Sequence, residues 1–195
     1  METNRLEAFS DGVFAIVITL LVLEIRVPPM ANLDAGLIHL WPSYLAYVMS
    51  FIVIGAIWIN HHAMFDMIAK ADHKLLLLNT FHLLLIAFIP FTTAVLAKSL
   101  HEHTSQHIAA AFYGGILTLI GLLVTAMWYY ASRNRHRLVS SITKEQARRV
   151  GQRYLVGPGG YAVATILAIL SHWAAIALFV FLNAYFLWPR RTSDG

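Results

Sequence analysis

The chain has 195 residues, of which 58% are hydrophobic and only 12% are charged, with a formal net charge of +4. The charged share is about half that of an ordinary soluble domain. Because a chain of this length buries only part of its surface on folding, it cannot hide so much apolar surface in one water-soluble core. The surplus is therefore predicted to face lipid. The sequence has no cysteine, which excludes a disulfide framework and a thiolate metal site.

Four apolar runs each have the length of a membrane-spanning helix. A hydrocarbon core of about 30 Å needs about 20 helical residues, and this length is met at residues 6–25, 41–59, 75–97 and 108–130. A further apolar stretch, residues 154–188, would be roughly 50 Å long as one helix, too long for a single crossing. We expect it to split near Ser171 into spans 154–170 and 172–188. The sequence thus predicts an all-α membrane protein, a single domain of residues 1–195 with six transmembrane helices.

The distribution of lysine and arginine predicts the orientation of these spans. Basic residues collect in cytoplasmic loops. With six spans and a cytoplasmic N-terminus, only Arg26 and Lys98 would lie on the outer side. A five-span chain would also place Arg190 and Arg191 there. We therefore expect a multi-pass protein of the cell inner (plasma) membrane with both termini in the cytoplasm.

The basic segment of residues 133–153 explains the positive net charge without a nucleic-acid partner. As an inner loop it is predicted to meet the anionic headgroups of the lipid bilayer. It lacks the interleaved aromatic side chains that are typical of single-stranded nucleic-acid binding. Within it, Thr143 and Gln146 have the spacing of a capping box, which predicts a short surface helix that begins at Thr143.

Two features predict how the spans pack. Small residues let helix backbones approach closely, and we favour packing within the chain over a subunit interface for the stripe formed by Gly114, Thr118, Gly121 and Thr125. Pro90 lies inside the third span and predicts a kink there.

The first span holds most of the polar chemistry. Ionisable residues inside a span are costly and usually face the protein interior or a water-filled path. The first helix has Arg5 at its start and carries the acids Glu7, Asp11 and Glu24. Ser10 and Asp11 define a polar face, whereas another face is an aliphatic stripe with the spacing i, i+4, i+7, formed by Ile16, Leu20 and Leu23. Spacing alone leaves two interpretations open. Either the stripe faces lipid, with Thr19 bonded to its own helix, or it lines a water-filled path.

Several motifs resemble those of one family. The segment 5–12 reads R-L-E-A-F-S-D-G, and W-I-N-H-H follows at 58–62, L-L-L-L-N at 75–79 and P-F at 90–91. The opening segment matches the pattern R-x-x-x-F-S-D-G. In these motifs the chain resembles the transmembrane protein 175 family of potassium channels, and the resemblance runs over nearly the whole chain.

The resemblance implies a potassium channel without a pore loop or carbonyl filter, and this sequence has no T-V-G-Y-G segment. Bacterial members with six spans assemble as homotetramers in which the first helix lines a central pore. The family's constriction falls on Ile16, Leu20 and Leu23, and its hydroxyl layer on Thr19. Rings of four aliphatic side chains would form a hydrophobic gate that blocks ions by dewetting. Potassium sheds water more cheaply than sodium and should pass better. The expected selectivity is modest because aliphatic side chains supply no tuned coordination, and the Thr19 hydroxyl would raise it.

A structural network is expected to hold the first helix in place. Arg5 and Asp11 are predicted to form a pair that positions this helix rather than touches the ion. The expected members of the network are Arg5, Phe9, Ser10, Asp11, Gly12, Trp58, His61, His62, Asn79 and His82. At the outer end, Glu24 either concentrates cations at the pore mouth or is a solvated acid.

Two other functions stay open, a secondary transporter of a small ion and a polytopic membrane enzyme. A transporter would show broken helices at the middle of the membrane, and the first span has no glycine or proline at its middle. An enzyme would need several acids or histidines converging from different spans. The chain offers few of these, so we expect no catalysis.

Two groups of residues fit a metal ion by residue type. The outer segment 101–107 reads H-E-H-T-S-Q-H, which suits a transition metal or a solvated, pH-sensitive loop. His61, His62 and Asp66 likewise admit a metal or an enzymatic role. We favour the solvated loop for the first group. The sequence prediction is no metal site and no cofactor, with potassium as the permeant ion.

Overall fold

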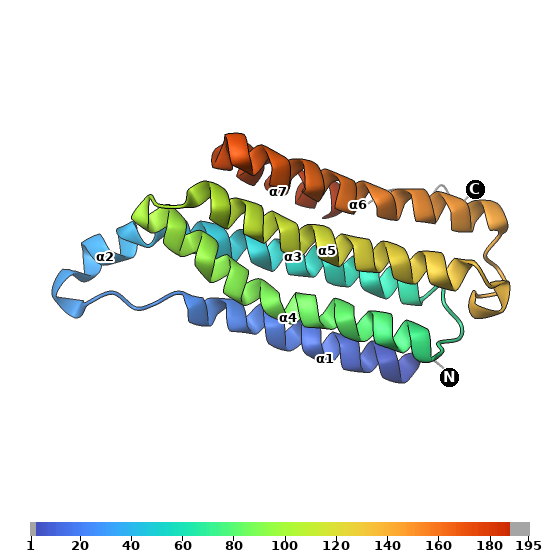
Figure 1. Cartoon of the computed structure of the whole chain (residues 1–195). Helices are drawn as coiled ribbons and strands as arrows, with labels where there is room; N and C mark the ends of the chain where they lie inside the picture. Colours follow the sequence, from blue (N-terminus) through green and yellow to red (C-terminus); the bar gives the residue numbers. More distant parts are fainter. Residues whose placement is uncertain (1–2, 188–195) are drawn as a thin grey trace.

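The computed structural model describes residues 3–187, and its elements are helical apart from an isolated antiparallel bridge between Ile68 and Leu138. Short 3-10 turns occur at Leu21–Glu24, Met30–Asn32 and Arg135–Arg137. The α-helices, shown in Figure 1, are α1 (Asn4–Leu20), α2 (Leu33–His39), α3 (Trp41–Phe65), α4 (His73–Glu102), α5 (Gln106–Ser132), α6 (Lys144–Leu170) and α7 (His172–Leu187). The prediction of an all-α chain is confirmed over these residues.

Five helical segments of the described chain are long and apolar enough to cross a membrane. They are Asn4–Glu24, Trp41–Phe65, His73–Glu102, Gln106–Ser132 and Lys144–Leu170. The helix α7 is apolar but shorter, so a sixth crossing stays a prediction. Ser171 separates α6 from α7, because its backbone is extended and its hydroxyl oxygen accepts a hydrogen bond from the N–H of Ala174. Residue 188, the end of the last predicted span, lies outside the described residues.

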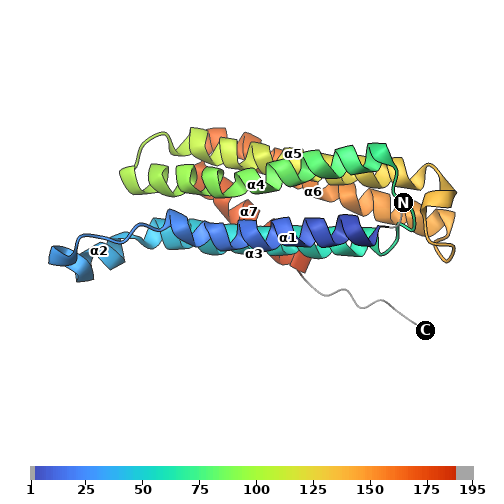
Figure 2. The same cartoon turned by 90° about the horizontal axis from the view of Figure 1, so that it is seen from below.

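The long helices lie side by side (Figures 1 and 2). Helix α1 contacts α3 and α4, while α5 contacts α4, α6 and α7. The N-terminus lies at the same end of the bundle as the α3–α4 and α5–α6 connections, and α2 lies at the other end (Figure 1). The main core is filled by apolar side chains from every long helix, among them Phe14, Val53, Ile86, Tyr113, Ala164 and Phe179. Helix α1 therefore sits at the side of the bundle, with one face in the core.

Small residues bring α5 close to α6 and α7. A Cβ atom at Gly114 would lie 2.5 Å from Thr165 Oγ1 of α6 and 2.7 Å from the ring of Phe179 of α7. A Cβ atom at Gly121 would lie 3.0 Å from Pro158 Cδ of α6. Only glycine leaves room for these neighbours. The small-residue stripe is thus used for packing within the chain, as predicted.

Helix α6 continues through Pro158 because α5 replaces a lost hydrogen bond. Proline has no N–H to donate to the carbonyl four residues earlier, which is that of Tyr154. The hydroxyl of Thr125 on α5 lies 2.8 Å from this oxygen and 2.8 Å from its own helix's Gly121 carbonyl, so its proton serves both. The Tyr154 carbonyl oxygen is therefore not left without a hydrogen-bond donor inside the bundle.

At the start of α6 the predicted capping box is confirmed, but the predicted short surface helix is not. The capping box is present, since the N–H of Gln146 donates to Thr143 Oγ1 at 3.1 Å and Thr143 N–H donates to Gln146 Oε1 at 2.8 Å. The expected short surface helix is wrong as a separate element, because α6 runs unbroken from Lys144 to Leu170. The hydrogen bond from Thr125 removes the need for a break at Pro158.

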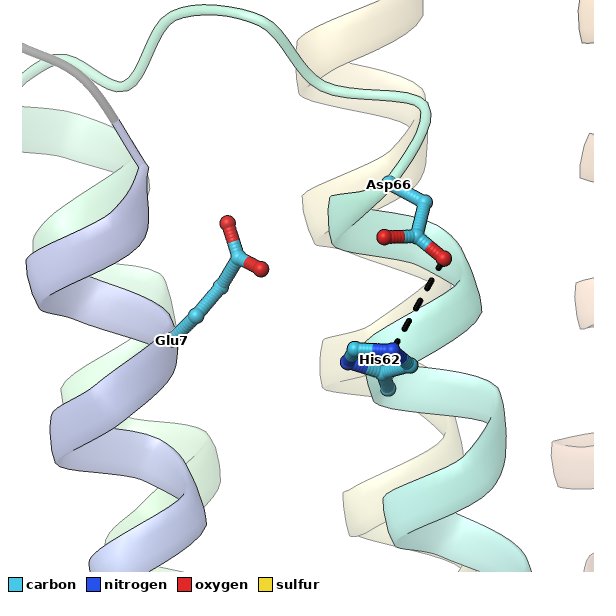
Figure 3. Close-up of side chains that lie close together, drawn as sticks. All are labelled: Glu7, His62 and Asp66. Atoms are coloured by element: carbon cyan, nitrogen blue, oxygen red, sulfur yellow. Dashed lines mark ion pairs between the residues drawn. The ribbon is translucent and has the colours of Figure 1, made fainter.

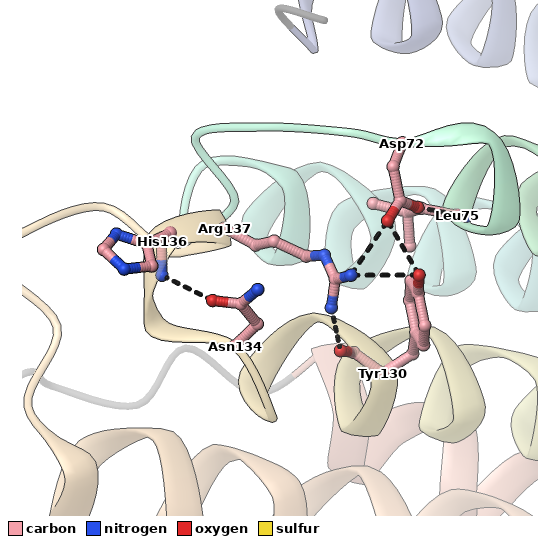
Figure 4. A network of polar contacts seen from close by, with 6 residues as sticks. All are labelled: Asp72, Leu75, Tyr130, Asn134, His136 and Arg137. Atoms are coloured by element: carbon pink, nitrogen blue, oxygen red, sulfur yellow. Dashed lines mark hydrogen bonds and ion pairs between the residues drawn. The ribbon is translucent and has the colours of Figure 1, made fainter.

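A polar clasp, formed by Asp72, Tyr130 and Arg137, joins two connections at the N-terminal end of the bundle (Figure 4). Asp72 caps α4 by accepting from Leu75 N–H at 3.0 Å. It also accepts from the Tyr130 hydroxyl at 2.7 Å and from Arg137 Nη2 at 2.9 Å. The guanidinium lies over the Tyr130 ring, 4.2 Å from its centre. The α3–α4 connection is thereby fixed to the segment that follows α5, where Asn134 Oδ1 accepts from the His136 N–H.

The electrostatics of this clasp favour the charged form of Asp72. Burial raises the pKa of the Asp72 carboxyl, but the hydrogen bonds from Tyr130 and Leu75 and the charge of Arg137 outweigh it. The net result is a pKa below the ordinary value of 3.8. The clasp is therefore an intact ion pair at neutral pH.

Candidate pore helix and its polar anchor

Helix α1 has one buried and one uncovered face. The buried face carries residues three or four positions apart, as expected for one side of a helix, and consists of Leu6, Ser10, Phe14 and Val17. The aliphatic stripe lies on the uncovered face, where Ile16 is 61% exposed, Leu20 41% and Leu23 72%. Within one chain, nothing packs over this stripe enough to bury it.

The buried face of α1 is held by a chain of hydrogen bonds to α4 and α3. Asn79 Nδ2 of α4 donates to Ser10 Oγ at 3.0 Å, and Ser10 donates to the Leu6 carbonyl at 2.8 Å. Asn79 Oδ1 lies 2.8 Å from His61 Nε2 of α3. Because an amide oxygen only accepts, the proton belongs to His61 Nε2. His61 also stacks on His82, with ring centres 5.5 Å apart. The sequence prediction thus named side chains that the structure brings together.

A second link joins α1 to α3 at the side of the bundle. The indole Nε1 of Trp58 donates to Asp11 Oδ1 at 2.8 Å. The Trp58 ring stacks on His62, one turn further along α3, with ring centres 6.0 Å apart. Asp11 is half-buried, so this charge-assisted bond is partly shielded from water. The bond fixes the rotation of α1 about its own axis.

The expected pair between Arg5 and Asp11 is wrong for a single chain. Among the ion pairs of the described residues, none joins these two side chains. Six positions along a helix separate them by about 120° around the axis and about 9 Å along it, so they point in different directions. Arg5 and Phe9 are exposed, and a Cβ atom at Gly12 would meet nothing within 4 Å. These three motif residues share the open sides of α1.

The end of α1 changes geometry at the stripe. The α-helix ends at Leu20 and continues as a 3-10 turn through Glu24. Side chains three positions apart eclipse one another in a 3-10 helix, so Leu20 and Leu23 lie nearly above one another. Thr19 is exposed beside them and donates its hydroxyl proton to the Ile16 carbonyl at 2.8 Å. Glu24 is exposed beyond the stripe.

Comparison with known proteins places the chain in a family. The sequence pattern described as "Endosomal/lysosomal potassium channel TMEM175" matches residues 5–90. A protein of Chamaesiphon minutus named a potassium channel is 40% identical over 190 residues, which cover 95% of this chain and 93% of that one. The chain belongs to the TMEM175 family. A potassium channel of Streptomyces collinus is 41% identical over 189 residues, covering 95% of this chain and 91% of the relative.

The TMEM175 fold is shared as well. The crystal structure described as a lysosomal potassium-selective channel TMEM175 homolog from Chamaesiphon minutus matches with a TM-score of 0.85 and 41% identity. The match covers 94% of this chain and 95% of that chain. The resemblance inferred from the R-x-x-x-F-S-D-G and W-I-N-H-H motifs is therefore confirmed, and the family matched is one of channels rather than of enzymes.

Among the polar contacts of this TMEM175 chain that sequence reasoning missed, three bear on how the helices are held together. The clasp of Asp72 with Arg137 joins residues 65 positions apart, and the bond from Thr125 to Tyr154 joins residues 29 apart. The third is the approach of Glu7 to α3. The proline of α6 was a usable signal for the second contact, because it leaves an acceptor that a neighbouring hydroxyl must satisfy.

Proposed function

We propose that this chain forms a channel that conducts potassium across a membrane, with four copies arranged around their α1 helices. One observation carries the proposal: α1 is anchored by hydrogen bonds on one side and leaves the aliphatic stripe uncovered on the other. An exposed apolar stripe on a helix with a buried polar anchor needs either lipid or other chains to cover it. The names of the Chamaesiphon and Streptomyces relatives support the conduction of potassium.

The proposed gate consists of rings of Ile16, Leu20 and Leu23 around the four-fold axis. Aliphatic rings that meet closely exclude water, and an ion cannot shed its hydration shell without ligands to replace it. A small rotation or outward shift of α1 widens the rings and admits partly hydrated ions. Potassium sheds water more cheaply than sodium and therefore passes better, and the preference is modest because aliphatic side chains supply no ligands tuned to either ion.

Thr19 is the proposed selectivity residue beside this gate. Its hydroxyl proton is engaged by the Ile16 carbonyl, so the oxygen keeps its lone pairs free to face outward. Four such oxygens around an axis would provide partial coordination for a dehydrated cation. The ring would then raise the potassium preference above that of aliphatic side chains alone.

The proposed setting is the cell inner membrane with the N-terminus in the cytoplasm. The connections that follow α3 and α5 lie at the same end of the bundle as the N-terminus (Figure 1). These connections and the first turns of α6 carry the basic residues of the segment 133–153 together with Lys70. The excess of positive charge at that end supports the cytoplasmic assignment.

The function is tested by reconstituting the protein in liposomes and measuring potassium and sodium flux separately. We expect flux of both ions, with potassium faster. Protein-free liposomes provide the leak control. Flux of neither ion, or uptake of one ion only when a second solute gradient drives it, would contradict a channel and favour a transporter.

Cysteine accessibility separates a pore-facing stripe from a lipid-facing one. The natural chain has no cysteine, so single variants can be labelled without background. Ile16→Cys and Leu23→Cys should react with small water-soluble thiol reagents. Ile18→Cys, which lines a groove against α3, and Ile166→Cys, which is 64% exposed on α6, should react slowly. If cysteines at Ile16 and Leu23 reacted as slowly as a cysteine at Ile166, the stripe would lie in lipid.

A further inference from the structure

Three potential metal ligands meet between α1 and α3 at the N-terminal end of the bundle. Glu7 of α1 points across the gap toward His62 and Asp66, which lie one turn apart on α3 (Figure 3). One ligand atom from each side chain lies within 4.8 Å of the other two. His62 Nε2 and Asp66 Oδ2 are 3.9 Å apart. Glu7 is half-buried, while His62 and Asp66 are exposed, so an ion from water can reach the group.

The charge of this group is not balanced by the protein. Among the ion pairs of the described residues, Glu7 takes part in none and Asp66 pairs only with His62. Two carboxylates facing one imidazole therefore create a local negative potential that favours a cation. In the clasp, by contrast, the negative charge of Asp72 is balanced by the positive charge of Arg137.

The orientation of the His62 ring is set by Trp58, one turn earlier on α3. Trp58 stacks on the His62 ring and donates a hydrogen bond to Asp11, so the same indole orients the imidazole and holds α1 against α3. A metal site gains affinity when neighbouring groups orient its ligands in this way. One of the three candidate ligands, His62, is thus oriented by its neighbour before any ion binds.

We propose that Glu7, His62 and Asp66 bind a divalent transition-metal ion of the Zn²⁺ class and that the bound ion tethers α1 to α3. Zinc takes imidazole nitrogen and carboxylate oxygen at about 2.0–2.2 Å in tetrahedral geometry, which places two ligand atoms about 3.4 Å apart. The long Glu7 side chain can close the remaining distance by rotation about its side-chain bonds. Water completes the coordination at the open side. The mixed nitrogen and oxygen ligands favour zinc, nickel or cobalt over magnesium.

The tether has a consequence for conduction that rests on the proposed function. The gate residues and Glu7 belong to the same helix, and widening of the gate requires α1 to move relative to its neighbours. A metal that joins α1 to α3 restrains that movement, so Zn²⁺ on the N-terminal side is expected to reduce potassium flux.

Binding is tested by isothermal titration of the purified full-length protein with Zn²⁺, with Mg²⁺ as the comparison ion. Glu7→Gln keeps the size of the side chain but weakens its oxygen as a ligand, and His62→Ala removes the nitrogen. Both should lower zinc affinity by about tenfold or more. Glu24→Gln and His101→Ala change an exposed acid and an exposed histidine at the other end and should leave this binding event unchanged.

The outcomes separate the tether from its alternatives. Full zinc affinity in Glu7→Gln would overturn the proposal, because the ion would then be held by α3 alone. Loss of the site in His101→Ala but not in His62→Ala would overturn it as well. In liposomes, zinc should slow potassium flux through the natural chain and have a weaker effect on Glu7→Gln. Absence of potassium flux without zinc would contradict the proposed function while the binding result still decides the metal site.

Discussion

At the residue scale, Thr19 shows how a side chain bonded to its own helix can still take part in selectivity. A hydroxyl that donates to the carbonyl three or four residues earlier is common within helices and stabilises little. At Thr19 the same bond, to the Ile16 carbonyl, directs the oxygen lone pairs away from the helix. The bond is therefore compatible with a stripe that faces lipid and with one that lines a pore. Substitution of Thr19 tests the second interpretation.

Thr19→Ala should keep potassium conduction and lower the ratio of potassium to sodium permeability. The methyl side chain removes the oxygen without adding bulk to the constriction. Thr19→Ser keeps the hydroxyl and should retain most of the ratio, which makes it the matched control. The measurement is the reversal potential under bi-ionic conditions. An unchanged ratio in Thr19→Ala would exclude a selectivity role for the hydroxyl.

At the scale of elements, the contact between α5 and α6 depends on one hydroxyl. Pro158 removes the donor that Tyr154 O would otherwise have, and Thr125 supplies a replacement from the neighbouring helix. The glycine at 121 allows the two helices to approach closely enough for this bond. The proline, the glycine and the threonine therefore act together.

Thr125→Val should destabilise the protein more than Thr118→Val. Both hydroxyls donate to their own helix, but only that of Thr125 also reaches another helix. Loss of that bond leaves the Tyr154 carbonyl without a partner, which costs about 1–3 kcal/mol. Thermal denaturation of the two variants in detergent measures the difference. Equal destabilisation would show that the carbonyl finds another partner or water.

The clasp between the two connections should depend on pH through Asp72. Its pKa is below the ordinary value of 3.8, so the ionised form contributes stability that is complete above that value. The contribution is lost as the pH falls through the folded-state pKa. The stability difference between the natural chain and Asp72→Asn should therefore be constant from about pH 7 to about pH 5 and shrink below about pH 4. A difference that stays constant throughout would contradict this assignment.

At the scale of the whole molecule, the uncovered side of α1 requires an explanation that one chain does not supply. Arg5, Phe9 and Gly12 lie on the open sides of this helix together with the aliphatic stripe. Arg5 is the second residue of α1, at the proposed cytoplasmic end of the span, where its long side chain can reach either lipid headgroups or a neighbouring chain. Contact with a second copy would give the arginine polar partners and cover the phenylalanine. The assembly is therefore central to the proposed function.

Native mass spectrometry of the detergent-solubilised protein should report four chains of 21.9 kDa each. The physical reason is that the proposed pore needs copies of α1 around a closed axis, so that their stripes form rings, and four copies are the proposed number. Arg5→Ala should weaken this assembly, whereas Arg149→Ala, which removes an exposed residue paired with Glu145 within α6, should not. A mass of one or two chains under conditions that preserve conduction would contradict the tetramer.

Hydrophobic length and periodicity were sufficient to predict an all-α chain, the helix break at Ser171 and the two unlike faces of α1. These properties are local, because each depends on residues within one turn or one span of the membrane. Motif spacing also named Ser10, Asp11, Trp58, His61 and Asn79 as a group, although it paired Asp11 with Arg5. Angular position decided against that pair, since a helix directs side chains six positions apart to different sides.

Contacts between segments far apart in sequence were decided only by the tertiary structure. His62 and Asp66 are one helical turn apart and could be read as possible ligands from sequence, but Glu7 joins them only because α1 packs against α3. Asp72 and Arg137 meet only because two connections lie at the same end of the bundle. The relative placement of helices depends on how all their side chains fit together in the core, and no single segment of the sequence contains that information.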